Sequence, residues 1–345
     1  MTPRNWRIFP FELFILLNLL ATVLFLRIHG IGLTVRTFTN VAKVSLPLFL
    51  LYMAAGLLLT IGLAAIRKDL GDYLRTFFSP TSLLVAARIL LGAVILMYGY
   101  VWIKLTIPLT AASTADLFLW KLDIRVHMGL APFAAVPELL HRAGLLHLID
   151  LYYGKIYLPS VLLVFGLCSV HREIRFRLAF ALGYAIVWGL GGWLYLTLPS
   201  MGPCYERPAL YQAYQGELAI SRSTQTTLKD NYDRVMRARK TGTIEKPFNP
   251  GYGIAAFPSL HVAAHAFFTL LFWRRSRSLS ILFLSMTFLT FIGSLATGWH
   301  YAVDGYAGIL LAVLAWFAFR IASEKREQST SQADADSGKT RERAS

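Results

Sequence analysis

The sequence predicts an all-α, polytopic membrane helical bundle with about eight transmembrane helices. The chain has 345 residues, of which 56% are hydrophobic and only 15% are charged, and its mean hydropathy is +0.52. A soluble domain is closer to half apolar and a quarter charged. The apolar excess lies in runs of about 20 residues, the length needed to cross the hydrocarbon layer. An integral membrane protein is therefore predicted rather than a large globule.

The apolar runs give the order of the expected helices. They cover approximately residues 10–29, 44–66, 83–106, 153–171, 177–199, 255–273, 279–298 and 300–321. Lys155 and Pro159 interrupt the fourth run. We expect the first two runs to form an N-terminal pair within residues 1–82. The other six are expected to form a core within residues 83–321.

Short basic connectors predict the orientation in the membrane. "HREIRFR" (171–177) and "RRSRS" (274–278) are rich in arginine, as cytoplasmic connectors typically are. We therefore expect both chain ends in the cytoplasm, with a disordered polar tail at 322–345. The loop 200–252 and the segment 107–152 then face outside. Within the latter, "DLFLWKLDIRVHMGLAPF" (116–133) is expected to form a helix lying in the interface.

The net charge and the cysteines exclude some protein classes. A charge of +15 is typical of loops that face anionic lipid, and no soluble basic module is present that would predict nucleic-acid binding. Cys168 and Cys204 follow successive runs, so we expect them on opposite membrane faces and predict no disulfide framework. The first run lacks a small-residue cleavage site. Together with the short connectors, this favours a bacterial plasma (inner) membrane.

Polar residues stand at the heads of the sixth and eighth runs, where leucines would insert more easily. His261 lies in "GYGIAAFPSLHVAAHAFF" (251–268), and His300 and Asp304 lie in "GSLATGWHYAVDGYAG" (293–308). Ionisable side chains in such positions are typically functional. The predicted topology places both heads at a similar depth on the outer side. One helical hairpin would bring the two histidines level.

The spacing of these residues indicates a reactive pocket. His300 and Asp304 are four residues apart, so on a helix they share a face, and the carboxylate can orient the imidazole. Pro258 suits the first position of a helix, and Ser259 with the free amides beside it would bind an anion. An anion site that faces two histidines favours phosphoryl transfer, with one histidine attacking phosphorus and the other protonating the leaving oxygen.

"FPSLH" followed by "HYAVD" resembles the last two signatures of the type-2 phosphatidic acid phosphatase superfamily, usually P-S-G-H and S-R-x5-H-x3-D. The branch of inositol phosphorylceramide synthases is more similar, because it also uses "FPSLH", and the stretch "DIRVHMGLAP" (123–132) resembles the interfacial segment of that branch. The resemblance covers roughly residues 115–321 and implies a six-helix phosphatase-like core within 83–321.

The resemblance also implies roles for individual residues. His300 would be the nucleophile that forms a phospho-histidine, Asp304 would orient it, and His261 would be the general acid. Ser259 would bind the phosphate. The substrate implied is a phosphorylated lipid in the bilayer, with no metal and no other cofactor. The acceptor, which is either water or a hydroxyl group, and any protein partners stay open.

The sequence departs from the family pattern at its cationic residues. The Ser–Arg pair of the last signature falls on Gly293 and Ser294, and the Lys of the first signature (K-x6-R-P) falls on Ser200. A phosphate with two or three negative charges needs compensation. Arg207 is the first candidate to supply it. The cluster of Arg237, Arg239 and Lys240 in the outer loop is the second.

Three other interpretations follow from the same residues. His261, His265, His300 and Asp304 could form a zinc site, since His-x3-His places two imidazoles on one helix face. Taken alone, His265 is more simply interpreted as an interfacial or capped residue near a helix end. A proton-coupled transporter or flippase could use the intramembrane His and Asp, although transporters usually break their helices near the midplane. A scaffold without activity would accommodate the missing arginine.

Overall fold

The computed structural model describes residues 8–31, 35–111, 113–241 and 251–342, and within these ranges it is helical without a strand. The all-α class is confirmed. The first helices are α1 (Pro10–Ile28), α2 (Val35–Ile66), α3 (Leu70–Phe77), α4 (Pro80–Thr110), α5 (Asp116–Val126), α6 (Pro132–Arg142) and α7 (Leu146–Leu151). The π-helix η2 (Tyr152–Ile156), α8 (Tyr157–Ser169), α9 (Ile174–Ala185), the π-helix η3 (Ile186–Leu190) and α10 (Gly191–Leu194) follow. The chain continues with α11 (Pro203–Glu206), the 3-10 helix η4 (Pro208–Tyr214), α12 (Ala219–Thr241), α13 (Leu260–Phe272), α14 (Arg277–Ala296) and α15 (Ala302–Glu342).

Seven helical segments in the described part of the chain are long and apolar enough to cross a membrane. They are Pro10–Ile28, Phe38–Ile66, Pro80–Thr110, Leu146–Ser169, Ile174–Leu194, Arg277–Ala296 and Ala302–Glu324. Each corresponds to one of the eight predicted runs. The remaining run, at 255–273, contains the shorter helix α13 of 13 residues. The predicted orientation, with both chain ends in the cytoplasm, stays a prediction.

The predicted sixth span is shorter than its apolar run because α13 begins only at Leu260. Ser259 is the N-cap, so Pro258 precedes the cap and does not occupy the first helical position as predicted. The preceding chain is extended, and its amides at Ala256 and Phe257 donate to the carbonyl and the hydroxyl of Ser200. Irregular backbone at membrane depth is tolerated where protein buries it.

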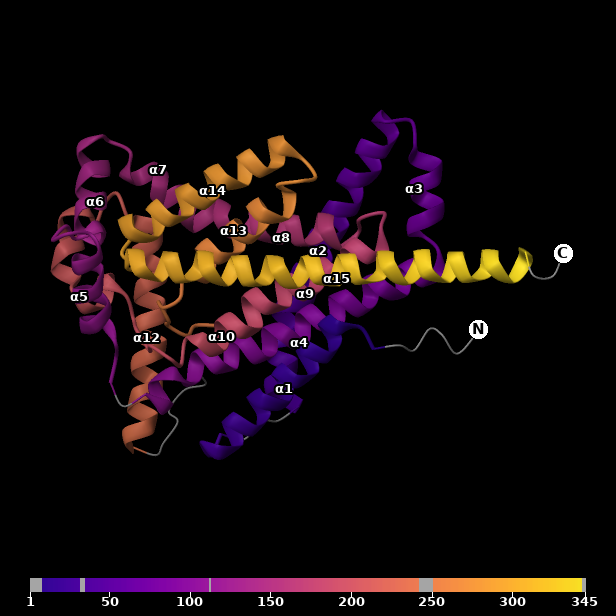
Figure 1. Ribbon diagram of the computed structural model, residues 1–345. Helices are drawn as coiled ribbons and strands as arrows, with labels where there is room; N and C mark the ends of the chain where they lie inside the picture. The colour runs from indigo at the N-terminus through magenta and orange to yellow at the C-terminus, as the bar shows by residue number, and fades with distance from the viewer. Residues whose placement is uncertain (1–7, 32–34, 112, 242–250, 343–345) are drawn as a thin grey trace.

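The outer segments lie across one end of the bundle (Figure 1), where α5, α6 and α12 cover the ends of the long helices. The predicted interfacial helix at 116–133 is shorter than expected: α5 ends at Val126, and a separate helix, α6, begins at Pro132. Met128 (φ 54°) and Gly129 (φ 96°) turn the chain between them. Pro132 then starts α6, where its missing N–H costs nothing.

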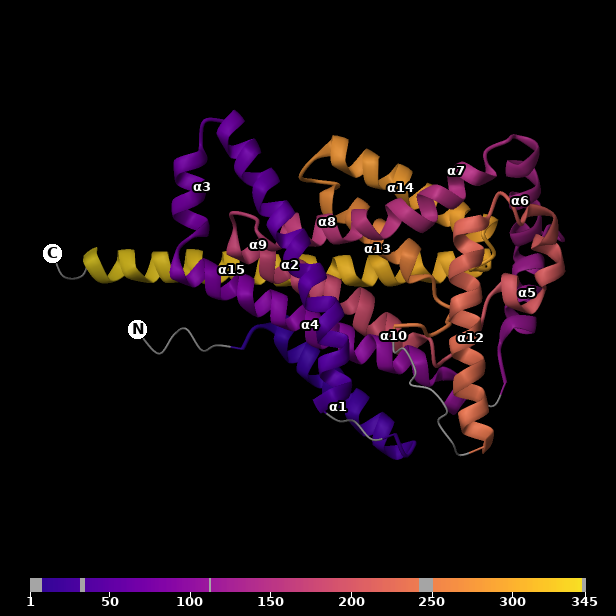
Figure 2. The ribbon, with the colours of Figure 1, turned by 180° about the vertical axis from the view of Figure 1, so that it is seen from behind.

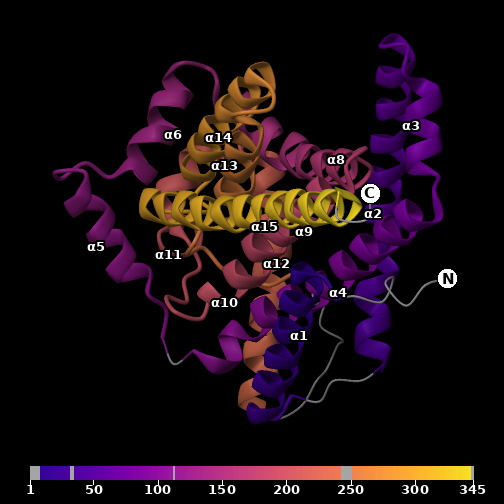
Figure 3. The same cartoon turned by 45° about the vertical axis from the view of Figure 1, so that its right-hand side comes forward.

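The core of the bundle brings the C-terminal helices together. α13 packs between α14 and α15, and α15 also packs against α9, which Figure 2 shows from behind. The N-terminal helices α2 and α3 stand on the opposite side from α5 and α6 (Figure 3), with α2 packed on α4 and α8. The division into an N-terminal pair and a six-helix core stays a prediction.

The C-terminal end differs from the disordered tail that the polar composition predicted. The backbone of α15 continues as a helix from the membrane segment to Glu342. Arg320 forms an ion pair with Glu324 one turn later, at 2.7 Å. The sequence beyond is rich in Ala, Glu, Lys, Arg and Gln, which have high helix propensity, so composition alone did not separate a polar helix from disorder.

The crossing of α2 and α8 is so close that it requires glycine. A Cβ atom at Gly166 would lie 1.9 Å from the carbonyl oxygen of Tyr52, and one at Gly56 would lie 2.5 Å from the backbone of Gly166. Small residues of this kind let membrane helices approach each other closely.

Gly166→Ala is therefore expected to lower the free energy of unfolding by about 1–3 kcal/mol, because the added methyl forces the two backbones apart. Gly62→Ala on α2 is the matched control, since a Cβ there meets nothing within 4 Å and alanine favours helix. Thermal denaturation in detergent should show a lower midpoint only for Gly166→Ala. Equal midpoints for the two variants would contradict the close crossing.

Candidate active site

The site is built where the N-terminal ends of α13 and α15 meet. The hydroxyl of Ser259 accepts a hydrogen bond from the Val262 amide at 3.4 Å, which caps α13. The Ser259 amide donates to the carbonyl of Asp304 at 2.9 Å. At Gly308 a Cβ would lie 2.3 Å from the Ser259 carbonyl oxygen, so glycine is needed there for the close approach. The two helix starts are thus held together through the backbone.

His261 and His300 meet at this junction. Nε2 of His300 lies 3.4 Å from Nδ1 of His261, and the ring centroids are 5.6 Å apart. The histidines are 39 residues apart in sequence. His300 is 2% exposed, whereas His261 is half-buried. The predicted juxtaposition of two imidazoles is therefore present in the structure.

Asp304 lies on the other side of the His300 ring. Its Oδ2 is 3.4 Å from Nδ1 of His300, and the same oxygen accepts a hydrogen bond from the Tyr301 amide at 2.9 Å. The two residues do not share a helix face as predicted, because α15 begins only at Ala302. His300 instead lies in the turn before the helix, where its amide donates to the Ser294 carbonyl. The carboxylate reaches the imidazole from the first turn of α15.

The gap between the two imidazoles is closed in this structure. A nucleophilic nitrogen approaches its target atom at about 3–3.5 Å, and a proton donor lies about 2.6–3.2 Å from its acceptor. A phosphoryl group placed between the rings therefore needs more than about 6 Å between the two nitrogens. Because they are 3.4 Å apart, a phosphoryl group can enter only if the rings move apart.

Comparison with known proteins identifies the family of this chain. The family model described as the PAP2 superfamily matches residues 117–318, which include both histidines and Asp304. The chain belongs to the PAP2 superfamily. No curated protein and no solved structure matches it. Membership of the superfamily supports a function of the phosphatase or phosphotransferase type at a membrane. The resemblance to the inositol phosphorylceramide synthase branch stays a prediction.

In this chain, the residues at the two signature positions that usually carry a lysine and an arginine have structural roles. Ser200, at the lysine position of the first signature, is 2% exposed and holds the extended chain before α13. Ser294, at the arginine position of the last signature, is 1% exposed, and its hydroxyl donates to the Phe291 carbonyl. Neither residue supplies charge, so the compensation of a phosphate has to come from elsewhere.

Neither cation candidate from the sequence has a contact with the histidines among the described residues, and their role stays a prediction. The guanidinium of Arg207 is exposed and lies 5.0 Å from the ring centroid of Trp120. Lys240 and Arg237 are exposed near the end of α12, and the side chain of Arg239 is outside the described residues. Gln225 of α12 contacts the Thr297 carbonyl near His300, and Lys240 follows it by about 22 Å along the helix axis.

Tyr153 and Tyr157 contact His261, although sequence analysis did not single them out. Their ring centroids lie 5.3 and 4.7 Å from that of His261. Tyr153 belongs to the π-helix η2, a feature that is frequent at functional sites. The signal in the sequence that could have indicated them is the presence of two tyrosines four residues apart. The sequence analysis of this run instead considered Lys155 and Pro159, because they interrupt its apolar character.

The alternative zinc site does not form. Nδ1 of His265 bonds with the Thr290 hydroxyl at 2.8 Å, and its Nε2 bonds with the Ser160 hydroxyl at 2.9 Å. His265 is 0% exposed, so it is a core residue and not the interfacial residue that was predicted. In the part of the chain that the structure describes, no three His, Cys, Asp or Glu side chains group in a way that could hold a metal ion.

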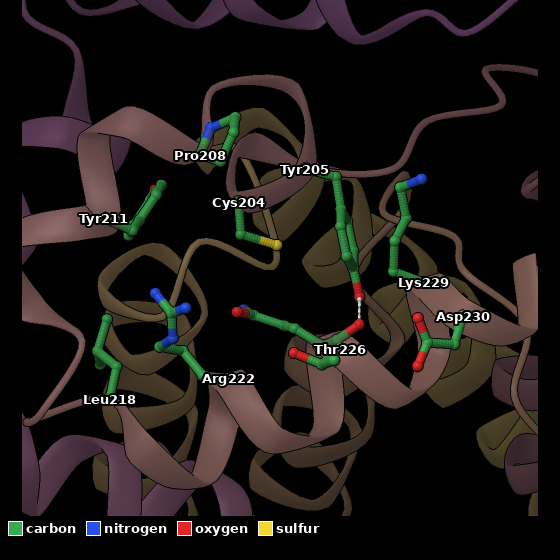
Figure 4. A pocket seen from close by; sticks show the side chains of 10 residues that line it. Cys204, Tyr205, Pro208, Tyr211, Leu218, Arg222, Thr226, Lys229 and Asp230 are labelled. Carbon is green, nitrogen blue, oxygen red and sulfur yellow. Dashed lines mark hydrogen bonds between the residues drawn. The ribbon is translucent and has the colours of Figure 1, made fainter. Parts of the chain in front are cut away.

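A cavity of about 230 Å³ lies beside the turn that carries His300. Figure 4 shows α12 lining one wall with Arg222, Thr226, Lys229 and Asp230, opposite Cys204, Tyr205 and Tyr211. The hydroxyl of Tyr205 donates to the Gln225 carbonyl at 3.0 Å, and the Gln225 amide donates to Thr297 at 2.8 Å. The cavity therefore adjoins the back of the His300 turn, and neither histidine lines it.

Two buried aspartates of α5 hold the backbone around the site in place. Both oxygens of Asp116 accept backbone N–H groups, from Met201 and Gly202, each at 2.9 Å. Asp123 uses only Oδ1, which accepts the Val303 amide at 3.0 Å, and its buried Oδ2 has no partner among the described residues. Burial raises the pKa of the Asp123 carboxyl above its usual range, opposed in part by the Val303 N–H. Asp123 thus fixes the residue before Asp304.

Asp123→Asn is expected to flatten the pH dependence of stability. Because its pKa is raised in the folded protein, the Asp123 carboxyl stays protonated to a higher pH in the folded state than in the unfolded chain. The contribution of this carboxyl to the free energy of unfolding is therefore fully present below the ordinary pKa of about 4. It is lost as the pH rises through the raised pKa. Unfolding midpoints across this pH range should fall in the wild type and not in Asp123→Asn. Asp116→Asn, which leaves one of two N–H groups unpaired, should lose about 1–3 kcal/mol at every pH.

Proposed function

We propose that this protein is a membrane phosphatase or phosphotransferase that acts on a phosphorylated lipid through a phospho-histidine at His300. The observation that supports it best is the arrangement of His261, His300 and Asp304 at the junction of α13 and α15, inside the PAP2 match. We propose that this junction faces outside the cytoplasm. The arginine-rich connector at 274–278, at the other end of α13, supports that orientation.

The reaction follows from the nitrogen atoms that face each other. Nε2 of His300 attacks phosphorus while the bond from phosphorus to the leaving oxygen breaks, and His261 gives its proton to that oxygen. Asp304, beside Nδ1, orients the His300 ring and stabilises the positive charge that develops on it. In the second half, water or an alcohol attacks the phospho-histidine. His261 takes the proton of the attacking group, and Nε2 of His300 is released.

The start of α13 would bind the phosphate oxygens. Ser259 accepts the Val262 amide, so its hydroxyl hydrogen is still able to donate to an anion. The amides of the first turn of α13 add the partial positive charge of a helix N-terminus. Ser259 is 0% exposed, and a contact with an anion is stronger in such a buried, low-dielectric place than in water.

Whether the acceptor is water or an alcohol depends on access of water to the phospho-histidine. His300 is almost fully buried, and this supports a phosphotransferase over a phosphatase. The resemblance of "FPSLH" to the inositol phosphorylceramide synthase branch also supports transfer of a phosphorylated head group. The transporter alternative receives no specific support, because the polar residues gather at one end of α13 and α15 and not at a broken midpoint.

The test is to trap the covalent intermediate. The full chain in lipid nanodiscs is incubated, with chelator, with phosphorus-labelled phosphatidic acid, a polyprenyl diphosphate or a phosphodiester phospholipid, and is then denatured. Protein-bound label that is stable to alkali and lost in acid is expected. His147→Ala, an exposed histidine on α7, is the control and should keep the label. Turnover without protein-bound label, or turnover that the chelator abolishes, would overturn the proposal.

A further inference from the structure

One half-buried basic side chain of a membrane-spanning helix has no acidic partner among the described residues. Lys104 lies near the end of α4, is half-buried, and forms no ion pair within the described ranges. Arg88 on the same helix pairs with Glu12, and the buried Arg177 of α9 binds backbone carbonyls. A charged side chain in a membrane-spanning helix costs free energy, and it is normally found there only with a charged or polar partner or in a functional site. The unpaired ammonium of Lys104 therefore indicates an anion that is supplied from outside the chain.

Lys104 lies at the level of the catalytic histidines. Its backbone packs against Gly253 in the extended chain before α13, where a Cβ would lie 2.8 Å from the Lys104 carbonyl carbon. Glycine is thus needed at position 253 for this close approach. The ammonium lies 5.7 Å from the ring centroid of Tyr195, and Lys104 is near enough to His261 for their charges to interact.

Two hydroxyl groups face the same region without a hydrogen-bond partner in the described part of the chain. They belong to Tyr153 and Tyr157, which are 7% and 3% exposed. Both rings contact His261, and Tyr153 is also within electrostatic range of Asp304. A buried hydroxyl is normally hydrogen-bonded. Two such groups beside a reactive histidine indicate a ligand that accepts hydrogen bonds.

The departure from the PAP2 signature makes room for this arrangement. Gly293 stands where the signature has serine, and a Cβ there would lie 2.9 Å from the Tyr153 ring. The ring of Tyr153 thus occupies the space beside a position that usually carries a side chain. The next position, Ser294, has no charge to offer, whereas the tyrosine hydroxyls have no hydrogen-bond partner and Lys104 has no ion pair among the described residues.

We propose that the ammonium of Lys104 and the hydroxyls of Tyr153 and Tyr157 bind the non-bridging oxygens of the phosphate and take the place of the missing arginine. The inference rests on the proposed function for the identity of the anion as a phosphate ester. One cation and two neutral donors replace the guanidinium, so the donor set comes from α4, η2 and α8 and not from α14. Two of these donors, Tyr153 and Tyr157, also contact the ring of His261.

The test uses tungstate, an inert phosphate analogue, with the full chain in nanodiscs. Lys104→Met should bind tungstate about 10- to 100-fold more weakly, as expected for a charge-assisted hydrogen bond of 1.5–3 kcal/mol, and Lys104→Arg should restore binding. Tyr153→Phe combined with Tyr157→Phe should weaken binding about 10-fold. Lys155→Met and Tyr152→Phe are the controls. Lys155 is exposed, and the Tyr152 hydroxyl is bonded to Met286 and Thr290.

A second measurement separates binding from a structural role. Without ligand, Lys104→Met should unfold at a higher temperature than the wild type, because it removes an unpaired charge from a span. A structural lysine would give the opposite result. Tungstate affinity unchanged in Lys104→Met, or no tungstate binding to the wild type at millimolar concentration, would overturn the inference. If binding depends on Lys104 but no phospho-histidine is trapped, the inference stands and the proposed reaction fails.

Discussion

Replacing His300 by alanine is expected to lower single-turnover rates by about 10⁴- to 10⁶-fold, the range found when a covalent nucleophile is removed. His300 is the histidine with a carboxylate on one ring nitrogen and the second histidine on the other. Alanine removes the atom that forms the bond to phosphorus, so no other residue at the junction can replace it. The measurement is release of labelled phosphate or phospho-head group in a single turnover, together with the protein-bound label.

The His300→Ala variant should also fold and bind. Its tungstate affinity should stay within a few-fold of wild type, because the proposed anion donors are Lys104, Tyr153 and Tyr157. Asp304→Asn should lose less than His300→Ala, since it removes orientation and not the reacting atom. Equal turnover in wild type and His300→Ala would exclude His300 as the nucleophile and would direct attention to His261.

Replacing His261 by alanine should give a loss that depends on the leaving group. For a lipid alcohol, whose oxygen must be protonated as it leaves, we expect a loss of about 10²- to 10⁴-fold. For 4-nitrophenyl phosphate, whose leaving oxygen is stable without a proton, the loss should be much smaller. Both rates are measured on the same nanodisc preparation, so differences in folding cancel.

The ratio of the two losses is the informative quantity. A general acid at His261 predicts that the ratio of rates for activated and lipid leaving groups rises in His261→Ala and does not change in the exposed control His147→Ala. A His261→Ala variant that loses the same factor on both substrates would show that His261 positions His300 through the 3.4 Å contact and donates no proton.

The fold could be predicted from the sequence to the extent that hydropathy decides it. Seven spans match apolar runs because a membrane helix must be apolar along its whole length. The run at 255–273 was misjudged because apolar residues at its start, such as Ala256, are buried by protein in an irregular segment, not by lipid in a helix. Hydropathy does not distinguish these two environments. The start of α13 at Leu260 depends on the cap formed by Ser259 and on Ser200, which is far away in sequence.

The site was predictable where the chemistry lies in local motifs. His261, His300 and Asp304 were found by their spacing, and the structure brings them together. Arg207 and Lys240 were selected by charge and loop position alone, and their role in binding phosphate stays a prediction. The donor that we propose, Lys104, lies on α4 about 150 residues earlier and packs against Gly253. An unpaired lysine inside an apolar run was the signal that could have found it.

The length of α13 has a consequence for how a lipid meets the enzyme. Thirteen residues extend over about 20 Å, whereas the hydrocarbon layer is about 30 Å thick. Since α13 ends beside the interfacial residues Trp273, Arg274 and Arg275, its first turn stops about 10 Å short of the opposite surface. A phosphate held by Ser259 would therefore sink below its neighbours in the leaflet while its acyl chains stay among theirs. The enzyme would draw the head group down to the histidines instead of lifting the lipid out of the membrane.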